Sequence, residues 1–83
     1  MSSLTNRVPI ARLPEPAERV RLRKLYGATQ LQVGAHIKVT RQMVNRYERG
    51  HSEPTGATRE RYAELLASWA RTETQVKEEL GKD

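Results

Sequence analysis

The sequence predicts an all-α protein, a compact bundle of four to five helices whose last helix is either part of the bundle or extended beyond it. Apolar residues recur at three- and four-residue spacings in several segments, and proline or glycine stands at the expected ends of those segments. With 83 residues, the chain is the size of one small domain. It contains no phenylalanine, so the core must come from aliphatic residues, the three tyrosines and the tryptophan.

Residues 1–14 show no sustained helical or strand period and include two prolines and several small polar residues. They are expected to form a flexible N-terminal arm. The first helix is expected over residues 16–26. Proline in its first turn and nearby glutamates favour its start, and Gly27 favours its end. Arg19, Arg21 and Lys24 are expected in solvent, and the apolar residues are expected to face the core: Ala17, Val20, Leu22, Leu25 and Tyr26.

Two short helices are expected next, over residues 30–37 and 41–49, with a turn between them. Thr29 and Thr40 are suitable N-caps, and Gly50 provides the final stop. The first of these helices presents Val33 and Ile37 four residues apart, a spacing that puts both on one face.

Gly34 lies inside the expected helix 30–37, where glycine costs roughly 0.5 to 1 kcal/mol relative to alanine. This cost suggests a packing reason, such as the close approach of another helix. In the helix 41–49, the inward set of Val44 and Tyr47, with Met43 beside it, is small. That helix is expected to bury little and to expose a polar face.

The last helical pattern begins near Thr55 or Thr58 and meets no proline or glycine from 57 to 80. We expect the folded domain to cover residues 15–69 and residues 70–83 to form a helical extension or a tail. Two apolar sets follow from this division. The core set is Tyr62, Leu66 and Trp69. The second set is Trp69, Val76 and Leu80, which either contact a second copy of the chain or belong to a fraying tail.

Charge is distributed unevenly along the chain. Residues 1–52 carry ten Lys/Arg and three Glu, a net charge of +7, whereas residues 53–83 carry five Lys/Arg and seven Asp/Glu, a net charge of −2. A basic segment attracts polyanions such as nucleic acid, although solvated arginine-rich helix faces are also common. There is no cysteine, no apolar run of about 20 residues and no signal-peptide pattern, so we expect a cytoplasmic protein with no disulfide, metal site, cofactor or membrane association.

The two short helices and their turn, residues 29–50, have the layout of a DNA-reading helix-turn-helix. A helix that reads the major groove needs forked or amide side chains, because arginine bonds guanine and glutamine or asparagine bonds adenine. The candidate base-reading residues are Arg41, Gln42, Asn45 and Arg46. A solvated polar face is the simpler interpretation, but no acidic residue occurs from 19 to 47, which favours a double-stranded DNA partner. In that case Arg7 and Arg12 of the arm could reach a groove.

The segments LRKLYGATQ (22–30) and TQLQVGAHIKVTRQMVNRYERGHSEP (29–54) resemble the lambda-repressor-like family, also called the Cro/repressor or XRE type, over about residues 17–69. The matching positions fall in register without gaps: Leu22, Arg23, Gly27, Thr29, Gln30, Val39, Thr40, Glu48, Gly50 and Pro54. Three departures stand out. Lys38 stands where the family usually has the turn glycine, and Gly34 and Val33 stand where it usually has alanine and leucine. Polar residues follow Pro54 in place of the family's apolar ones, so the fourth helix could be short or displaced.

The resemblance implies roles for individual residues. Arg41, Gln42 and Arg46 match the family's base-contacting positions, with Asn45 as a further candidate. Arg23 and Glu48 match an internal ion pair. The residues that the resemblance implies at the DNA backbone are Thr29, Gln30, Thr40, Arg49 and His51. Lys38 departs from the family and is added to this group because of its charge.

Two functions remain open at this point. The first is a homodimeric, sequence-specific transcriptional regulator, in particular a repressor of phage or mobile-element origin. The second is an antitoxin-like interaction protein that binds a small protein partner through its C-terminal helix and autoregulates through the helix-turn-helix. An enzyme is not expected, because the sequence shows no cysteine nucleophile, glycine-rich phosphate loop or paired carboxylates.

Overall fold

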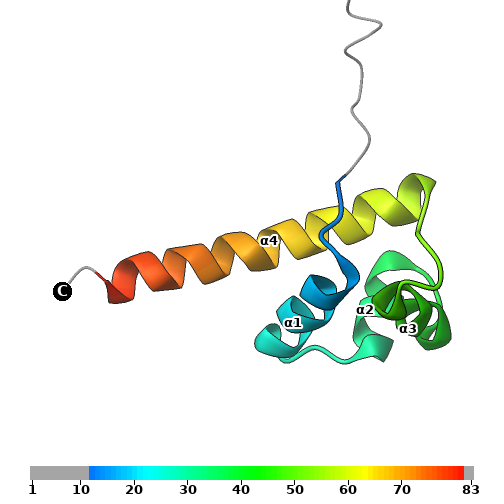
Figure 1. Ribbon diagram of the computed structural model, residues 1–83, viewed down its shortest axis with the longest axis horizontal. Coiled ribbons are helices and arrows are strands. Elements are labelled where there is room, and N and C mark those ends of the chain that lie inside the picture. Colours follow the sequence, from blue (N-terminus) through cyan, green and yellow to red (C-terminus); the bar gives the residue numbers. More distant parts are fainter. Residues whose placement is uncertain (1–11, 82–83) are drawn as a thin grey trace, which may run out of the picture.

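The computed structural model describes residues 12–81, which form four helices and no strand. Figure 1 shows three short helices, α1 (Pro16–Tyr26), α2 (Gln30–Ile37) and α3 (Arg41–Arg49), along one side of the long α4 (Gly56–Leu80). The all-α prediction is confirmed, and the segment after Pro54 forms one continuous helix of 25 residues rather than a short one. Residues 1–11, most of the expected N-terminal arm including Arg7, lie outside the described residues.

The helix ends coincide with the expected signals because these signals are local. Thr29 and Gln32 form a reciprocal capping box, in which each side chain accepts a hydrogen bond from the other residue's backbone N–H at 3.0 and 2.9 Å. Thr40 caps α3 by accepting from the backbone N–H of Met43 at 3.1 Å. Gly27 and Gly50 end α1 and α3 in the left-handed conformation, with φ of 79° and 76°.

One hydrophobic core joins the four helices. Its buried residues are Leu22, Val33, Ile37, Val44, Tyr47, Tyr62, Leu66 and Trp69. The expected burial of Tyr62, Leu66 and Trp69 is therefore confirmed. Leu13, which precedes α1, packs against this core. The folded part of the chain therefore includes at least one residue before residue 15.

The inward face of α1 differs from the prediction. Arg19, expected in solvent, is only 3% exposed, whereas Leu25 and Tyr26, expected in the core, are 58% and 57% exposed. Ala17 is also exposed, and Leu22 alone of the expected set is fully buried. The prediction was wrong because hydrophobicity assigned arginine to the solvent, without regard to the acceptors that the rest of the fold supplies.

Arg19 is buried because each side of its guanidinium has a partner. Its Nε donates to the carbonyl of Pro14 at 2.7 Å, and Nη1 donates to the carbonyl of Tyr47 at 3.0 Å. Nη2 lies 3.1 Å from Oε1 of Glu53 in the loop after α3. A buried charge is tolerated when it is paired and hydrogen-bonded, so Arg19 ties the start of α1 to the end of α3.

Gly34 does mark a close approach, but the approaching group is the turn and not another helix. A Cβ added at Gly34 would lie 2.7 Å from the carbonyl oxygen of Val39. The turn is also bonded to α2, since the backbone N–H of Val39 donates to the carbonyl of Gly34 at 2.8 Å. Absence of a side chain at Gly34 therefore lets the turn fold tightly onto α2.

The second half of α4 runs past the three short helices (Figure 1). It is held to α1 by Arg21, which donates to Glu73 at 2.9 Å and to Glu18 of its own helix at 2.7 Å. Beyond this contact, Val76 and Leu80 are 50% and 76% exposed. No helix within residues 12–81 combines the length and the apolarity that a membrane crossing requires.

Candidate nucleic-acid interface

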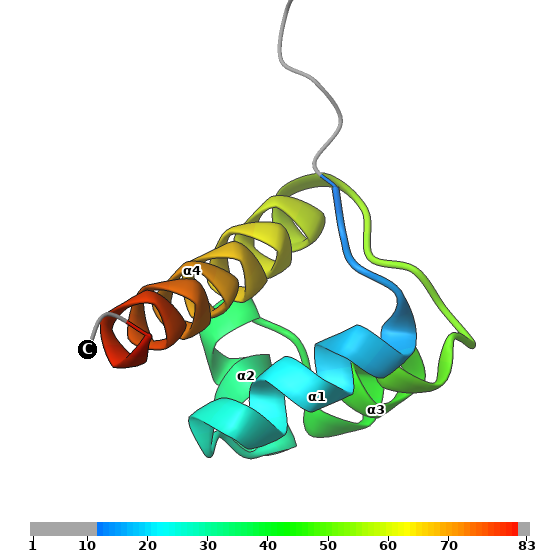
Figure 2. The same cartoon turned by 60° about the vertical axis from the view of Figure 1, so that its left-hand side comes forward.

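The turn between α2 and α3 fixes the angle between the two helices. Lys38 ends α2 in the left-handed conformation with φ of 68°, the one non-glycine residue with positive φ among those the structure describes. Figure 2 shows α1 in front of α2 and α3, with α4 above them at the upper left. Because Thr40 caps α3 directly after this turn, the start of α3 is held at a defined point of the surface.

The third helix is divided sharply between a buried and an exposed side. Val44, Tyr47 and Glu48 are buried. The four predicted base-reading residues lie outside this buried set: Arg41, Gln42 and Arg46 are exposed, and Asn45 is half-buried. The side chains of Arg41, Gln42 and Asn45 make no hydrogen bond or ion pair with any other residue from 12 to 81. Their polar groups are therefore available to a ligand.

The single acidic residue of α3 points away from this exposed face. The structure brings together Arg23 and Glu48, with Arg23 Nη2 3.0 Å from Glu48 Oε1 and with Nε bonded to the second carboxylate oxygen. The two side chains are 13% and 5% exposed. The hydrogen bonds to Glu48 raise the pKa of Arg23. Burial, reinforced by the Glu48 carboxylate, raises the pKa of Tyr62 to about 12, so the neighbouring phenol is neutral.

The residues expected at a DNA backbone divide into two groups. Lys38, Arg49 and His51 are exposed, and their side chains have no hydrogen-bond or ion-pair partner within the described part of the chain. Thr29 and Thr40 are also exposed but use their hydroxyl oxygens as helix caps. Gln30 is half-buried, and its Nε2 donates to Oε1 of Glu48 at 3.0 Å. Its amide is therefore already engaged with the buried ion pair.

Arg46 differs from the other exposed residues of α3. Its Nε donates to Oγ of Ser52 at 3.0 Å. Ser52 did not emerge from the sequence as a candidate, because a serine in a polar loop gives no local signal of a contact six residues away. The exposed cations Lys38, Arg41, Arg46 and Arg49, with Glu48 turned inward, leave this face positively charged.

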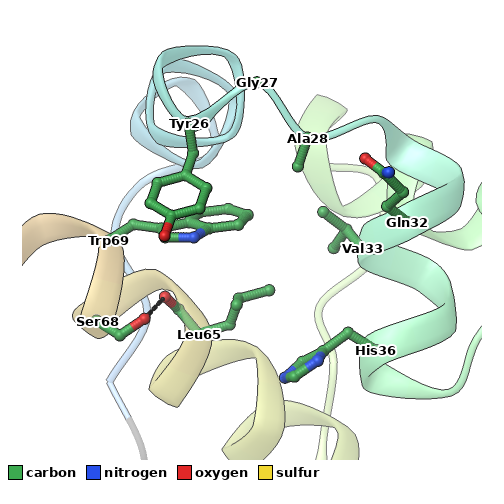
Figure 3. Close-up of a pocket in the computed structure, with 9 residues that line it drawn as sticks. All are labelled: Tyr26, Gly27, Ala28, Gln32, Val33, His36, Leu65, Ser68 and Trp69. Atoms are coloured by element: carbon green, nitrogen blue, oxygen red, sulfur yellow. Dashed lines mark hydrogen bonds between the residues drawn. The ribbon is translucent and has the colours of Figure 1, made fainter. Parts of the chain in front are cut away.

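The molecule also has a shallow pocket of about 550 Å³ away from α3. Figure 3 shows Tyr26 lying against Trp69, with His36 on the opposite side, and the two rings stack with centroids 5.0 Å apart. The lining residues come from α1, α2, α4 and the loop before α2, and none lies in α3. Within residues 12–81, no group of three metal-ligating side chains occurs.

A family model described as helix-turn-helix matches residues 21–67, which include α2, α3, most of α1 and the first half of α4. The chain therefore belongs to the lambda-repressor-like, or XRE-type, helix-turn-helix family, a family of DNA-binding regulators. Comparisons with curated proteins and with solved structures gave no match. Both α2 and α3 lie wholly within the matched segment, and α3 is the later of the two helices joined by the turn.

Proposed function

We propose that this protein is a sequence-specific repressor of transcription that inserts α3 into the major groove of double-stranded DNA. The observation that carries the proposal is the division of α3: its one acidic residue is buried in an ion pair, while Arg41 and Gln42 are exposed and have no side-chain partner among residues 12–81. The major groove is about 12 Å wide and presents a distinct set of donors and acceptors for each base pair. Arginine and glutamine can form paired hydrogen bonds with guanine and adenine there.

We assign Arg41, Gln42, Asn45 and Arg46 to base contacts. The polar groups of the first three have no partner within the described part of the chain, and Arg41 lies at the N-terminal end of α3, which enters the groove in this motif. The contacts to the DNA backbone are assigned to residues at or next to the ends of α2 and α3: Thr29, Gln30, Lys38, Thr40, Arg49 and His51. As a DNA-binding protein, it would act in the cytoplasm on the nucleoid, and we place it among the repressors of phage or mobile-element origin.

The protein is further proposed to bind as a homodimer. One recognition helix covers a short half-site, and two copies on a palindrome increase both affinity and specificity. The exposed end of α4 supports this assembly. A largely apolar groove of about 350 Å³ is lined by Leu25, Tyr26, Trp69 and Val76, together with Thr72, Glu73 and Lys77. Leu80 lies one turn beyond Val76 on the same face.

A second copy of the same chain is the occupant that the charges of this region favour. Lys24 precedes the groove residue Leu25 in α1, and Glu78 and Glu79 follow the groove residue Lys77 in α4, all three exposed. None of these three forms an ion pair with another residue from 12 to 81. In a twofold arrangement, the acidic end of one α4 would face the basic end of the partner's α1, so apolar and charged groups would both be matched.

Selection of DNA from a random pool tests the proposal. The full-length protein should recover a palindrome with a fixed half-site, and the spacing of the two half-sites would report the dimer geometry. The same selection with Arg41→Ala should relax one base position in each half-site, at a cost of roughly 1 to 3 kcal/mol. Equal loss of affinity by Arg41→Ala on the selected and on random DNA would contradict base reading by α3.

A further inference from the structure

The loop after α3 holds the side chain of Arg46 in one direction. Arg46 Nε donates to Ser52 Oγ at 3.0 Å, and Nη2 donates to the carbonyl oxygen of His51 at 3.5 Å. The loop is itself fixed, since the backbone N–H of His51 donates to the carbonyl of Arg46 at 2.9 Å. Gly50 allows this reversal through its left-handed conformation. Arg46 is therefore the one member of the candidate base-reading set that has partners among the described residues.

The contact uses only one edge of the guanidinium. Arginine has five N–H donors in a planar fork, and the loop engages one donor of Nε and one of Nη2. Both donors of Nη1 and the second donor of Nη2 have no partner within residues 12–81. These donors form the outer edge, which has the spacing needed to bond O6 and N7 of one guanine together.

We propose that Ser52 is a positioning residue, which presents the outer edge of Arg46 to a guanine and so sets the preference at that base pair without touching it. The inference rests on the proposed function. A long side chain that is already held loses less conformational freedom when it binds, and a fixed plane distinguishes guanine from other bases better than a mobile one. The hydroxyl of Ser52 also accepts from Nε without adding a negative charge near phosphate.

Arg41 provides a natural comparison within the same helix. It is exposed, it is assigned to a different base, and it forms no hydrogen bond with the loop that holds Arg46. Ser52 should therefore influence the base pair read by Arg46 and leave the base pair read by Arg41 unchanged. A purely structural role of Ser52 would alter both positions alike.

The experiment uses the full-length protein and the DNA site recovered by selection. Dissociation constants are measured for that site and for sites in which each base pair is replaced in turn. The base pair at which Arg46→Ala loses its preference is the guanine read by Arg46. At this base pair the unaltered protein should bind the selected site roughly 5- to 150-fold more tightly than a substituted site. Ser52→Ala should reduce that discrimination at least threefold and keep the discrimination at the Arg41 position. Ser52→Thr, which retains a hydroxyl, should restore it.

Three results would overturn the proposal. The first is a Ser52→Ala variant that still prefers guanine over other bases at the Arg46 position as strongly as the unaltered protein. The second is a Ser52→Ala variant whose affinity falls equally for every base sequence, since this indicates a phosphate contact. The third is a drop in discrimination at the Arg41 position to the same extent, which indicates a shifted helix. Failure of the unaltered protein to select any sequence would refute the proposed function too, whereas a selected site with an unchanged Ser52→Ala profile refutes only the role of Ser52.

Discussion

Arg23 of α1 and Glu48 of α3 form an ion pair inside the helix-turn-helix, with Nη2 and Oε1 3.0 Å apart. Gln30, the first residue of α2, donates to the same carboxylate oxygen at 3.0 Å. The carboxylate therefore connects three helices through side chains that are distant in sequence. It also removes the only negative charge of α3 from the face that is proposed to meet phosphate.

Removal of one member of this pair should destabilise the protein. Glu48→Leu leaves the guanidinium of Arg23 largely buried without its carboxylate, which should lower the free energy of unfolding by about 3 kcal/mol in urea titrations. The double variant with Arg23→Met removes both charges and should recover most of the loss. If Glu48→Leu alone is as stable as the unaltered protein, the ion pair does not connect the helices as described.

Substitution of Gly34 by alanine should destabilise the fold although alanine is the better helix former. The new Cβ would lie 2.7 Å from the carbonyl oxygen of Val39, a backbone atom that cannot move without moving the turn. We expect a loss of about 1 to 3 kcal/mol and weaker DNA binding, because α3 follows that turn. The neighbouring exposed variant Ala35→Gly should cost only roughly 0.5 to 1 kcal/mol in thermal unfolding. A stabilised Gly34→Ala protein would exclude the close approach.

Stability and DNA affinity should change in opposite directions at Lys38. Its φ of 68° costs a residue with a Cβ roughly 1 kcal/mol, so Lys38→Gly should increase the unfolding free energy by somewhat less than that amount. Loss of the ammonium should weaken binding to all sequences equally and reduce the salt dependence of log K by about one unit. Fluorescence anisotropy at several salt concentrations measures both effects. Unchanged salt dependence would place Lys38 away from phosphate.

The bounds of the three short helices could be predicted because their end signals lie within a few residues of each end. Thr29, Thr40 and Gly50 act through the neighbouring backbone, so sequence alone locates them. The inward face of α1 could not be predicted in the same way. Arg19 is buried by the carbonyl of Tyr47 and the carboxylate of Glu53, which are 28 and 34 residues away.

The candidate site shows the same limit. Residue type and helical spacing were sufficient to nominate the exposed residues of α3 as base readers. They were not sufficient to distinguish Arg46 from Arg41, because the contact of Arg46 with Ser52 depends on how the loop turns after Gly50. Similarly, Gln30 was assigned by position alone, and its bond to Glu48 becomes visible only when α2 and α3 are packed together.

The ion pair of Arg21 in α1 with Glu73 in α4 should weaken in acid. Hydrogen bonds from Arg21 lower the pKa of Glu73 and of Glu18 below their ordinary value of 4.5. Because the folded-state pKa is lowered, the contribution to stability is present above that value and is lost as the pH falls through the lowered pKa. The Glu73→Gln variant should therefore have a lower melting temperature than the unaltered protein at pH 7. At the lowest pH the two melting temperatures should be equal. A difference in melting temperature that persists through acid would mean that charge is not its cause.

The exposed end of α4 should govern assembly. Val76 lines the apolar groove against Leu25 and Tyr26, so Val76→Lys should place a charge in the proposed dimer contact and weaken self-association at least tenfold. Gln75→Lys adds the same charge to the neighbouring exposed position, which does not line that groove, and should leave association unchanged. Sedimentation of the two variants measures the difference directly.

DNA binding then separates a dimerisation role from a partner-binding role for this face. If two copies meet there, Val76→Lys should weaken binding to a palindrome while it leaves the affinity for a single half-site intact, because residues 41–49 are untouched. Loss of affinity for the half-site as well would indicate damage to the fold. A protein that stays monomeric on the palindrome before any substitution would reject the homodimer and favour the antitoxin-like alternative, in which the groove formed by Leu25, Tyr26, Trp69 and Val76 receives a different small protein.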